Sequence, residues 1–158
     1  MFHPTGRHAR RSAAWFLGVA LALGAGETSA LFIVNQPWVV PAAKGRSTAV
    51  YMDVTSTEGA ALVGASSEAS ASVSIRGPQA ASRMARLVLP AREMVRLAPK
   101  GYRLVLERTT RPIKRGERVR LTLIIEAADG SQQEIGVDAE ARFDSPLEAE
   151  RRAHAPHH

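Results

Sequence analysis

Three of the five histidines stand at the C-terminus, where His154, His157 and His158 form the sequence HAPHH. Neutral imidazoles are ligands for Cu(II), Zn(II) and Ni(II). Histidines this close together predict a metal site in the tail, which must become ordered before it can bind. The alternative interpretation is a solvated chain end that holds no ion.

The other two histidines, His3 and His8, lie near the N-terminus, so none occurs between His8 and His154. The sequence has no recognisable pair of nucleophile and base, and no glycine-rich phosphate loop follows a strand. We therefore expect no enzymatic activity. Cysteine is absent as well, which excludes thiolate metal chemistry and leaves the hydrophobic core to hold the fold.

The first thirty residues predict a secretory signal peptide. Arg7, Arg10 and Arg11 form a basic start, and residues 13–26 are an apolar run too short to span a bilayer comfortably. Thr28-Ser29-Ala30 supplies small residues at a plausible cleavage point. We therefore expect an exported, periplasmic protein. An uncleaved N-terminal membrane anchor is the alternative.

The net charge is +6 for the whole chain, and +4 without residues 1–30, which contain three arginines and one glutamate. Aromatic residues, which would stack on bases, make up 5% of the sequence. This charge is too small to indicate a nucleic-acid-binding protein. A solvated basic surface is the simpler interpretation.

Beyond residue 30, short alternating stretches are separated by turn residues, a pattern typical of β-strands with one buried face. In Tyr102–Glu107 the alternation places Leu104 and Leu106 on one face, and Arg103 and Glu107 on the other. Such spacing predicts an all-β sandwich or a small barrel. The expected strands cover residues 31–35, 38–40, 48–57, 60–65, 73–76, 84–89, 93–97, 102–107, 118–126 and 133–141, with a loop at 66–72.

Six short motifs follow one another along this region: Pro37-Trp38-Val39, Ala49-Val50-Tyr51-Met52, LVGASS at 62–67, LAPKGY at 97–102, RPIKRG at 111–116 and VRLTL at 119–123. In this order they resemble the PCu(A)C family of periplasmic copper chaperones. The resemblance covers residues 31–141. It implies a cupredoxin-like Greek-key β-sandwich.

The resemblance also implies a function. In the PCu(A)C family two histidines and two methionines hold Cu(I) for delivery towards the copper centre of cytochrome c oxidase. Imidazole and thioether donors suit this ion. Copper is therefore the implied cargo, and cytochrome c oxidase assembly factors are the implied partners.

Other residue types occupy most of the family's ligand positions in this sequence. The first histidine corresponds to Arg76, the hairpin methionine to Met84, and the closing Tyr-His-x-Met to Tyr102-Arg103-Leu104-Val105. A guanidinium group stays protonated and has no lone pair for a metal, and valine has no donor atom. We therefore expect copper binding that is weak, or shifted to Met84, His154, His157 and His158.

By the same resemblance, Arg76 and Arg103 would lie near each other at one end of the sandwich. Two guanidinium groups could bind a carboxylate or a phosphate-like anion. The alternative function is thus a metal-free envelope module that recognises an anionic ligand or a partner protein. A simpler interpretation is that Glu107, Glu93 or Asp53 neutralises the two arginines.

The chain is thus expected to have three parts. Residues 1–30 form a signal peptide, residues 31–143 a PCu(A)C-like β-sandwich domain, and residues 144–158 a flexible histidine-containing tail with a helical turn over 146–151. We predict a periplasmic, copper-chaperone-like protein that retains few of the Cu(I) ligands of its family.

Overall fold

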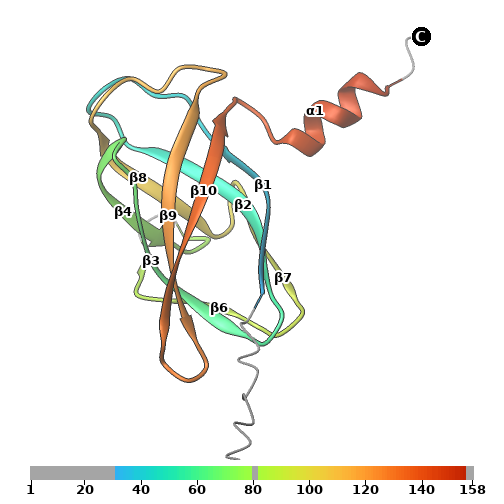
Figure 1. Ribbon diagram of the computed structural model, residues 1–158. Coiled ribbons are helices and arrows are strands. Elements are labelled where there is room, and N and C mark those ends of the chain that lie inside the picture. The colour runs from blue at the N-terminus through green and yellow to red at the C-terminus, as the bar shows by residue number, and fades with distance from the viewer. Residues whose placement is uncertain (1–30, 80–81, 156–158) are drawn as a thin grey trace, which may run out of the picture.

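A computed structural model describes residues 31–79 and 82–155, so the predicted signal peptide lies outside the described residues (Figure 1). The described chain forms ten strands and one helix. In chain order these are β1 (Phe32–Val39), β2 (Thr48–Ser56), β3 (Ala60–Ser66), β4 (Ser70–Arg76), β5 (Arg83–Met84), β6 (Leu87–Leu89), β7 (Met94–Leu97), β8 (Arg103–Thr109), β9 (Arg118–Ala127), β10 (Gln132–Ala141) and α1 (Pro146–Ala153).

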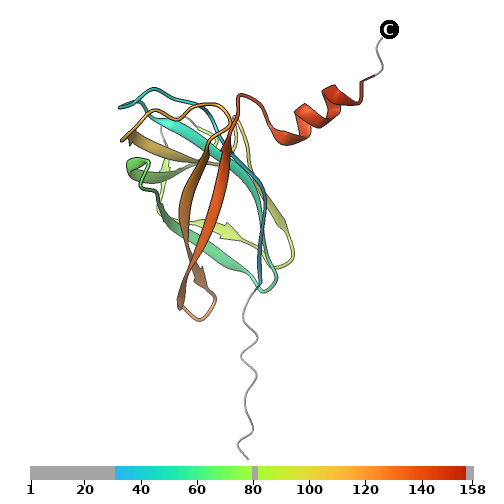
Figure 2. The same ribbon diagram turned by 45° about the horizontal axis from the view of Figure 1, so that its top comes forward.

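The strands form one continuous hydrogen-bonded sheet in the order β5-β4-β8-β2-β1-β10-β9-β3-β6, with β7 paired to β2. The sheet folds over into two layers, with β1 and β10 at the junction (Figures 1 and 2). These two strands pair in parallel, with Trp38 opposite Glu140 and Val39 opposite Ala141. The other pairings between strands are antiparallel. The predicted all-β class is therefore confirmed.

The core lies between the two layers and consists of aliphatic side chains. Leu104 and Leu106 of β8 are fully buried, as are Leu121 and Leu123 of β9. Their neighbours Arg103, Val105 and Glu107 are only partly buried, so the alternation predicted for this strand is confirmed. Since each burial removes apolar surface from water, these leucines contribute strongly to stability.

Most predicted strand ends agree with the structure to within one or two residues, and three larger differences remain. The two expected segments at 31–40 form the single strand β1, because Gln36 takes a positive φ of 50° and absorbs a β-bulge. The expected strand at 84–89 is two strands, since β5 pairs with β4 and β6 pairs with β3. The expected loop at 66–72 is shorter, because β4 begins at Ser70.

The helix α1 follows β10 and projects beyond the body of the sandwich in both views (Figures 1 and 2). Its start is a capping box: the Ser145 hydroxyl accepts the Glu148 N–H, and the Glu148 carboxylate accepts the Ser145 N–H. The helical turn predicted for 146–151 is thus present and extends to Ala153. Within the described residues, no helix combines the length and apolar character needed to cross a bilayer.

Replacing Leu104 with alanine should lower the free energy of unfolding by about 2–5 kcal/mol, because a cavity opens in the core. Val88 is 61% exposed on β6, and Val88→Ala is the control, with an expected change within about 0.5 kcal/mol. Urea denaturation followed by circular dichroism measures both. Equal effects of the two substitutions would contradict the described core.

Candidate functional site

The positions predicted to correspond to the copper ligands of the PCu(A)C family lie on β4, β5 and β8. Arg76 pairs directly with Arg103 of β8 on one side and with Arg83 of β5 on the other. Directly paired residues point to the same face of a sheet, so the three arginines form one row on the outward face. We call this group, together with Glu107, the arginine cluster. The predicted proximity of Arg76 and Arg103 is therefore present in the structure.

Glu107 is the carboxylate of this cluster. One of its oxygens lies 2.8 Å from Nη2 of Arg76 and 3.5 Å from Nη2 of Arg83. The Ser74 hydroxyl donates to the same oxygen at 2.8 Å, and the Ser47 hydroxyl donates to the other at 3.2 Å. These hydrogen bonds, above all the one from Arg76, hold the pKa of Glu107 below its ordinary value of 4.5. The carboxylate is therefore ionised at neutral pH.

Arg103 finds different acceptors. Its Nη1 donates to the backbone carbonyls of Gly77 at 2.8 Å and Gly101 at 3.1 Å. It forms no ion pair with a carboxylate of the described chain. Its charge acts on Tyr51, whose hydroxyl pKa is raised by burial and lowered to a lesser extent by Arg103. The hydrogen bonds thus fix the guanidinium group without neutralising it.

The prediction that Glu107, Glu93 or Asp53 would neutralise these arginines holds for one pair. Glu107 neutralises Arg76. Asp53 instead binds Arg96 through two hydrogen bonds of 2.9 and 3.2 Å. The cluster consequently contains three guanidinium groups and one carboxylate, so its outward face carries a surplus of positive charge.

Met84 lies close to the cluster but on the other face of the sheet. It pairs with Ile75, which pairs with Leu104, and both of these side chains are buried. Met84 is partly buried and packs against the core. Its sulfur lies beside Gly77, 3.4 Å from where a Cβ would stand. The one thioether predicted as a ligand is therefore not aligned with Arg76 and Arg103.

The tail histidines are only partly described. His154 is exposed at the C-terminal end of α1, and its Nδ1 lies 2.8 Å from the Glu150 carbonyl oxygen. His157 and His158 lie outside the described residues. Among residues 31–79 and 82–155, no three histidine, aspartate or glutamate side chains come together as a metal site. The tail site remains a prediction.

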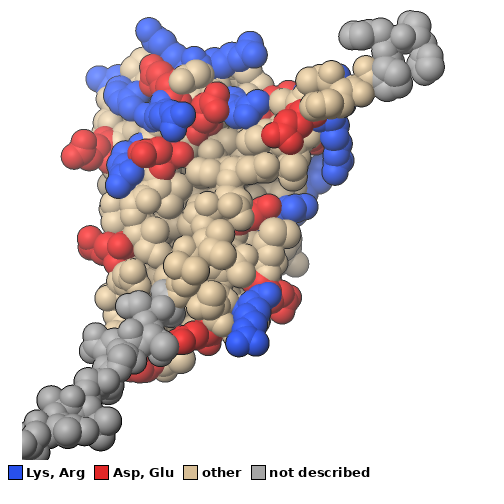
Figure 3. Space-filling view, turned by 45° about the vertical axis from the view of Figure 1, so that its right-hand side comes forward, with Lys and Arg blue, Asp and Glu red and all other residues tan. Residues whose placement is uncertain are grey.

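A second group of cations is exposed at one end of the sandwich. Figure 3 shows Lys and Arg gathered at the upper end of the molecule, above a broad uncharged area. The loops between β1 and β2 and between β8 and β9 lie at this end and contain exposed Lys44, Arg46, Lys114 and Arg115, and Arg108 is exposed near the end of β8. These side chains fit the predicted solvated basic surface.

Sequence reasoning missed Ser47, Ser74 and Arg83 as members of this site. Ser74 and Arg83 reach Glu107 through the strand register, since β4 lies between β5 and β8. Ser47 reaches it from the loop before β2. The alternation of Ser72, Ser74 and Arg76 along β4 is the one sequence signal that could have placed Ser74 on the outward face.

Solved structures of copper-related domains share this fold. The apo PCuAC domain from PmoF1 is 23% identical, with a TM-score of 0.62, and the match covers 72% of this chain and 94% of that one. The copper-bound PCuAC domain from PmoF2 is 24% identical, with a TM-score of 0.61, and the match covers 72% of this chain and 93% of that domain. The Cu(I) form of DR1885 from Deinococcus radiodurans is 26% identical, with a TM-score of 0.53, and the match covers 78% of this chain and 87% of that one.

These likenesses confirm the cupredoxin-like β-sandwich and the resemblance to PCuAC domains. At the level of the sequence, residues 33–138 match the family described as "Putative lipoprotein LpqE-like". The chain therefore belongs to the LpqE-like family. No curated protein matches it.

Replacing Glu107 with glutamine should lower the free energy of unfolding at neutral pH by about 1–2 kcal/mol, because Arg76 loses its charged acceptor. Glu107 has a lowered pKa in the folded state, so its contribution is complete above pH 4.5 and is lost as the pH falls through that lowered pKa. The difference between wild type and variant should therefore shrink in acid. Urea denaturation at several pH values measures it.

Glu117→Gln is the matched control. Glu117 also pairs with an arginine, Arg111, at 2.7 Å, but in a more exposed setting. Exposed pairs contribute little, so its effect at neutral pH should be smaller. An equal loss in both variants, or a loss for Glu107→Gln that is independent of pH, would contradict the described network.

Proposed function

We propose that the chain is a copper-chaperone-like protein of the cell envelope whose arginine cluster acts by recognising an anionic surface of a partner. The observation that carries this proposal is the charge imbalance of the cluster, in which Glu107 is paired with Arg76 while Arg83 and Arg103 add further positive charge. The side chain of Arg83 is 66% exposed and thus accessible to a partner. Guanidinium groups bind carboxylates through paired, charge-assisted hydrogen bonds.

The donor set of the cluster does not suit Cu(I). Guanidinium groups offer no lone pair, and the serine and carboxylate oxygens are hard donors that suit other ions. Met84 packs on the opposite face. Residual copper binding is therefore assigned to Met84 or to His154, His157 and His158, where isolated donors predict weak affinity. Handling of copper would then depend on protein partners.

The proposed location and partners rest on sequence and family. The predicted signal peptide at 1–30 supports export to the periplasm. The PCuAC likeness supports a role near the copper centre of cytochrome c oxidase, and its assembly factors are the proposed partners. A module of this kind would assist copper delivery without carrying the ion at its arginine cluster.

Titration of the full chain with Cu(I) against bathocuproine disulfonate tests the copper part of this proposal. We expect the chelator to remove all the Cu(I), and Met84→Ala to behave as wild type. Cu(II) uptake should disappear when His154, His157 and His158 are all replaced by alanine, because the imidazoles are its ligands. If the wild type retained Cu(I) in the presence of the chelator, the proposal that the arginine cluster holds no copper would be contradicted.

The partner role is tested by complementation in cells that lack this chain. We expect the double variant Arg83→Gln/Arg103→Gln to restore less cytochrome c oxidase activity than wild type under copper limitation, because it removes the surplus charge and keeps the Arg76–Glu107 pair. Lys44→Gln/Arg46→Gln removes the same charge elsewhere and should restore activity fully. Full restoration by the Arg83/Arg103 variant would remove this role.

A further inference from the structure

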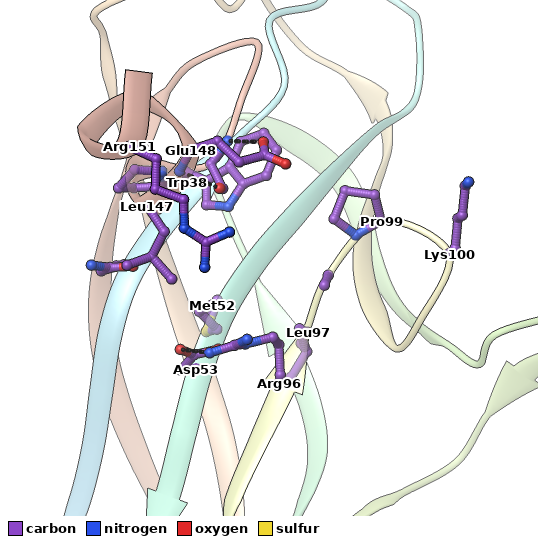
Figure 4. A pocket seen from close by; sticks show the side chains of 14 residues that line it. Trp38, Met52, Asp53, Arg96, Leu97, Pro99, Lys100, Leu147, Glu148 and Arg151 are labelled. Atoms are coloured by element: carbon purple, nitrogen blue, oxygen red, sulfur yellow. Dashed lines mark hydrogen bonds and ion pairs between the residues drawn. The ribbon is translucent and has the colours of Figure 1, made fainter. Parts of the chain in front are cut away.

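A cavity of about 380 Å³ opens between α1 and the outward face of β1, β2 and β7 (Figure 4). It lies apart from the ion pairs of Glu107, none of whose partners lines it. Its volume falls in the range typical of small-molecule sites, roughly 300–1,000 Å³. A water molecule takes up about 30 Å³ of liquid, so the cavity has room for roughly ten non-hydrogen atoms.

The wall of this cavity is mainly apolar. Trp38, Met52 and Leu97 come from the sandwich, Pro99 from the turn after β7, and Leu147 from α1. Trp38 is held by Tyr51, whose ring centre lies 4.7 Å away. Met52 and Leu97 are each 2% exposed and face the core, so they offer the cavity little side-chain surface, and Trp38, Pro99 and Leu147 form its apolar wall. This wall suits the apolar body of a ligand, because water would be released from it on binding.

The charged residues at the cavity differ in whether they are already paired. The Asp53 carboxylate is occupied by the two hydrogen bonds from Arg96. Glu148 is engaged in the capping box of α1. Arg151 forms no ion pair within the described chain, and Figure 4 shows its guanidinium group pointing into the cavity between Leu147, Trp38 and Met52.

An unpaired guanidinium group above an apolar floor favours a ligand with one negative end. We propose that this cavity binds a small amphiphile with a carboxylate that pairs with Arg151 and a short apolar body that lies against Trp38, Pro99 and Leu147. A cationic amphiphile would be repelled by the unpaired charge of Arg151. This site is independent of the proposed role of the arginine cluster.

Octanoate is a probe of suitable size, and Trp38 is a reporter in the cavity wall. The sequence has two tryptophans, Trp15 and Trp38. The experiment uses the full chain with Trp15→Phe, so that Trp38 is the one tryptophan that remains. We expect octanoate to change the Trp38 fluorescence saturably, and octanol and octylammonium to bind more weakly. Octanol or octylammonium binding as tightly as octanoate would overturn the proposal, and so would the absence of saturable binding by octanoate.

Two variants assign the binding to this cavity. Arg151→Gln should weaken octanoate binding about tenfold through loss of the charged hydrogen bonds, with little effect on octanol. Arg118→Gln removes the same charge from an exposed position on β9 outside the cavity wall and should leave the affinity unchanged. Ala98→Leu, at the cavity wall, should block both probes. Unchanged octanoate affinity in Arg151→Gln would overturn the proposal.

Discussion

The alternation of side chains along β8 is the constraint on which the structure depends. Leu104 and Leu106 fill the core, while Arg103, Val105 and Glu107 point outward. Because the outward positions do not enter the core, their chemistry can change without opening a cavity in it. This separation explains how a chain with arginines at these positions shares its fold with copper-bound domains.

An arginine at one of these outward, partly buried positions must find hydrogen-bond acceptors. A partly buried guanidinium group needs acceptors for its N–H groups, since an unsatisfied donor is costly. Glu107 and Ser74 satisfy Arg76, and two backbone carbonyls satisfy Arg103. The outward face is therefore a fixed hydrogen-bonded network. One carboxylate cannot balance three cations, and the remaining charge is what an anionic partner would recognise.

The sequence was sufficient to predict the strands whose residue pattern is local. Alternation predicted β8 and its two faces, and the motif order predicted the sandwich. The split of residues 84–89 into β5 and β6 was not predictable, because the two short strands pair with different layers. Arg83 and Ser47 were missed for a related reason, since strand register and loop placement bring them to Glu107.

The arginine cluster and the cavity below α1 are separate sites, and Tyr51 and Trp38 are the side chains that relate them. Tyr51 lies within the electrostatic influence of Arg103, Trp38 packs against Tyr51, and Trp38 lines the cavity. Trp38 and Tyr51 are 5% and 8% exposed, so the two rings form a rigid block between the sites. The cavity and the charged face thus lie on either side of this pair of rings, and neither site needs the other in order to bind.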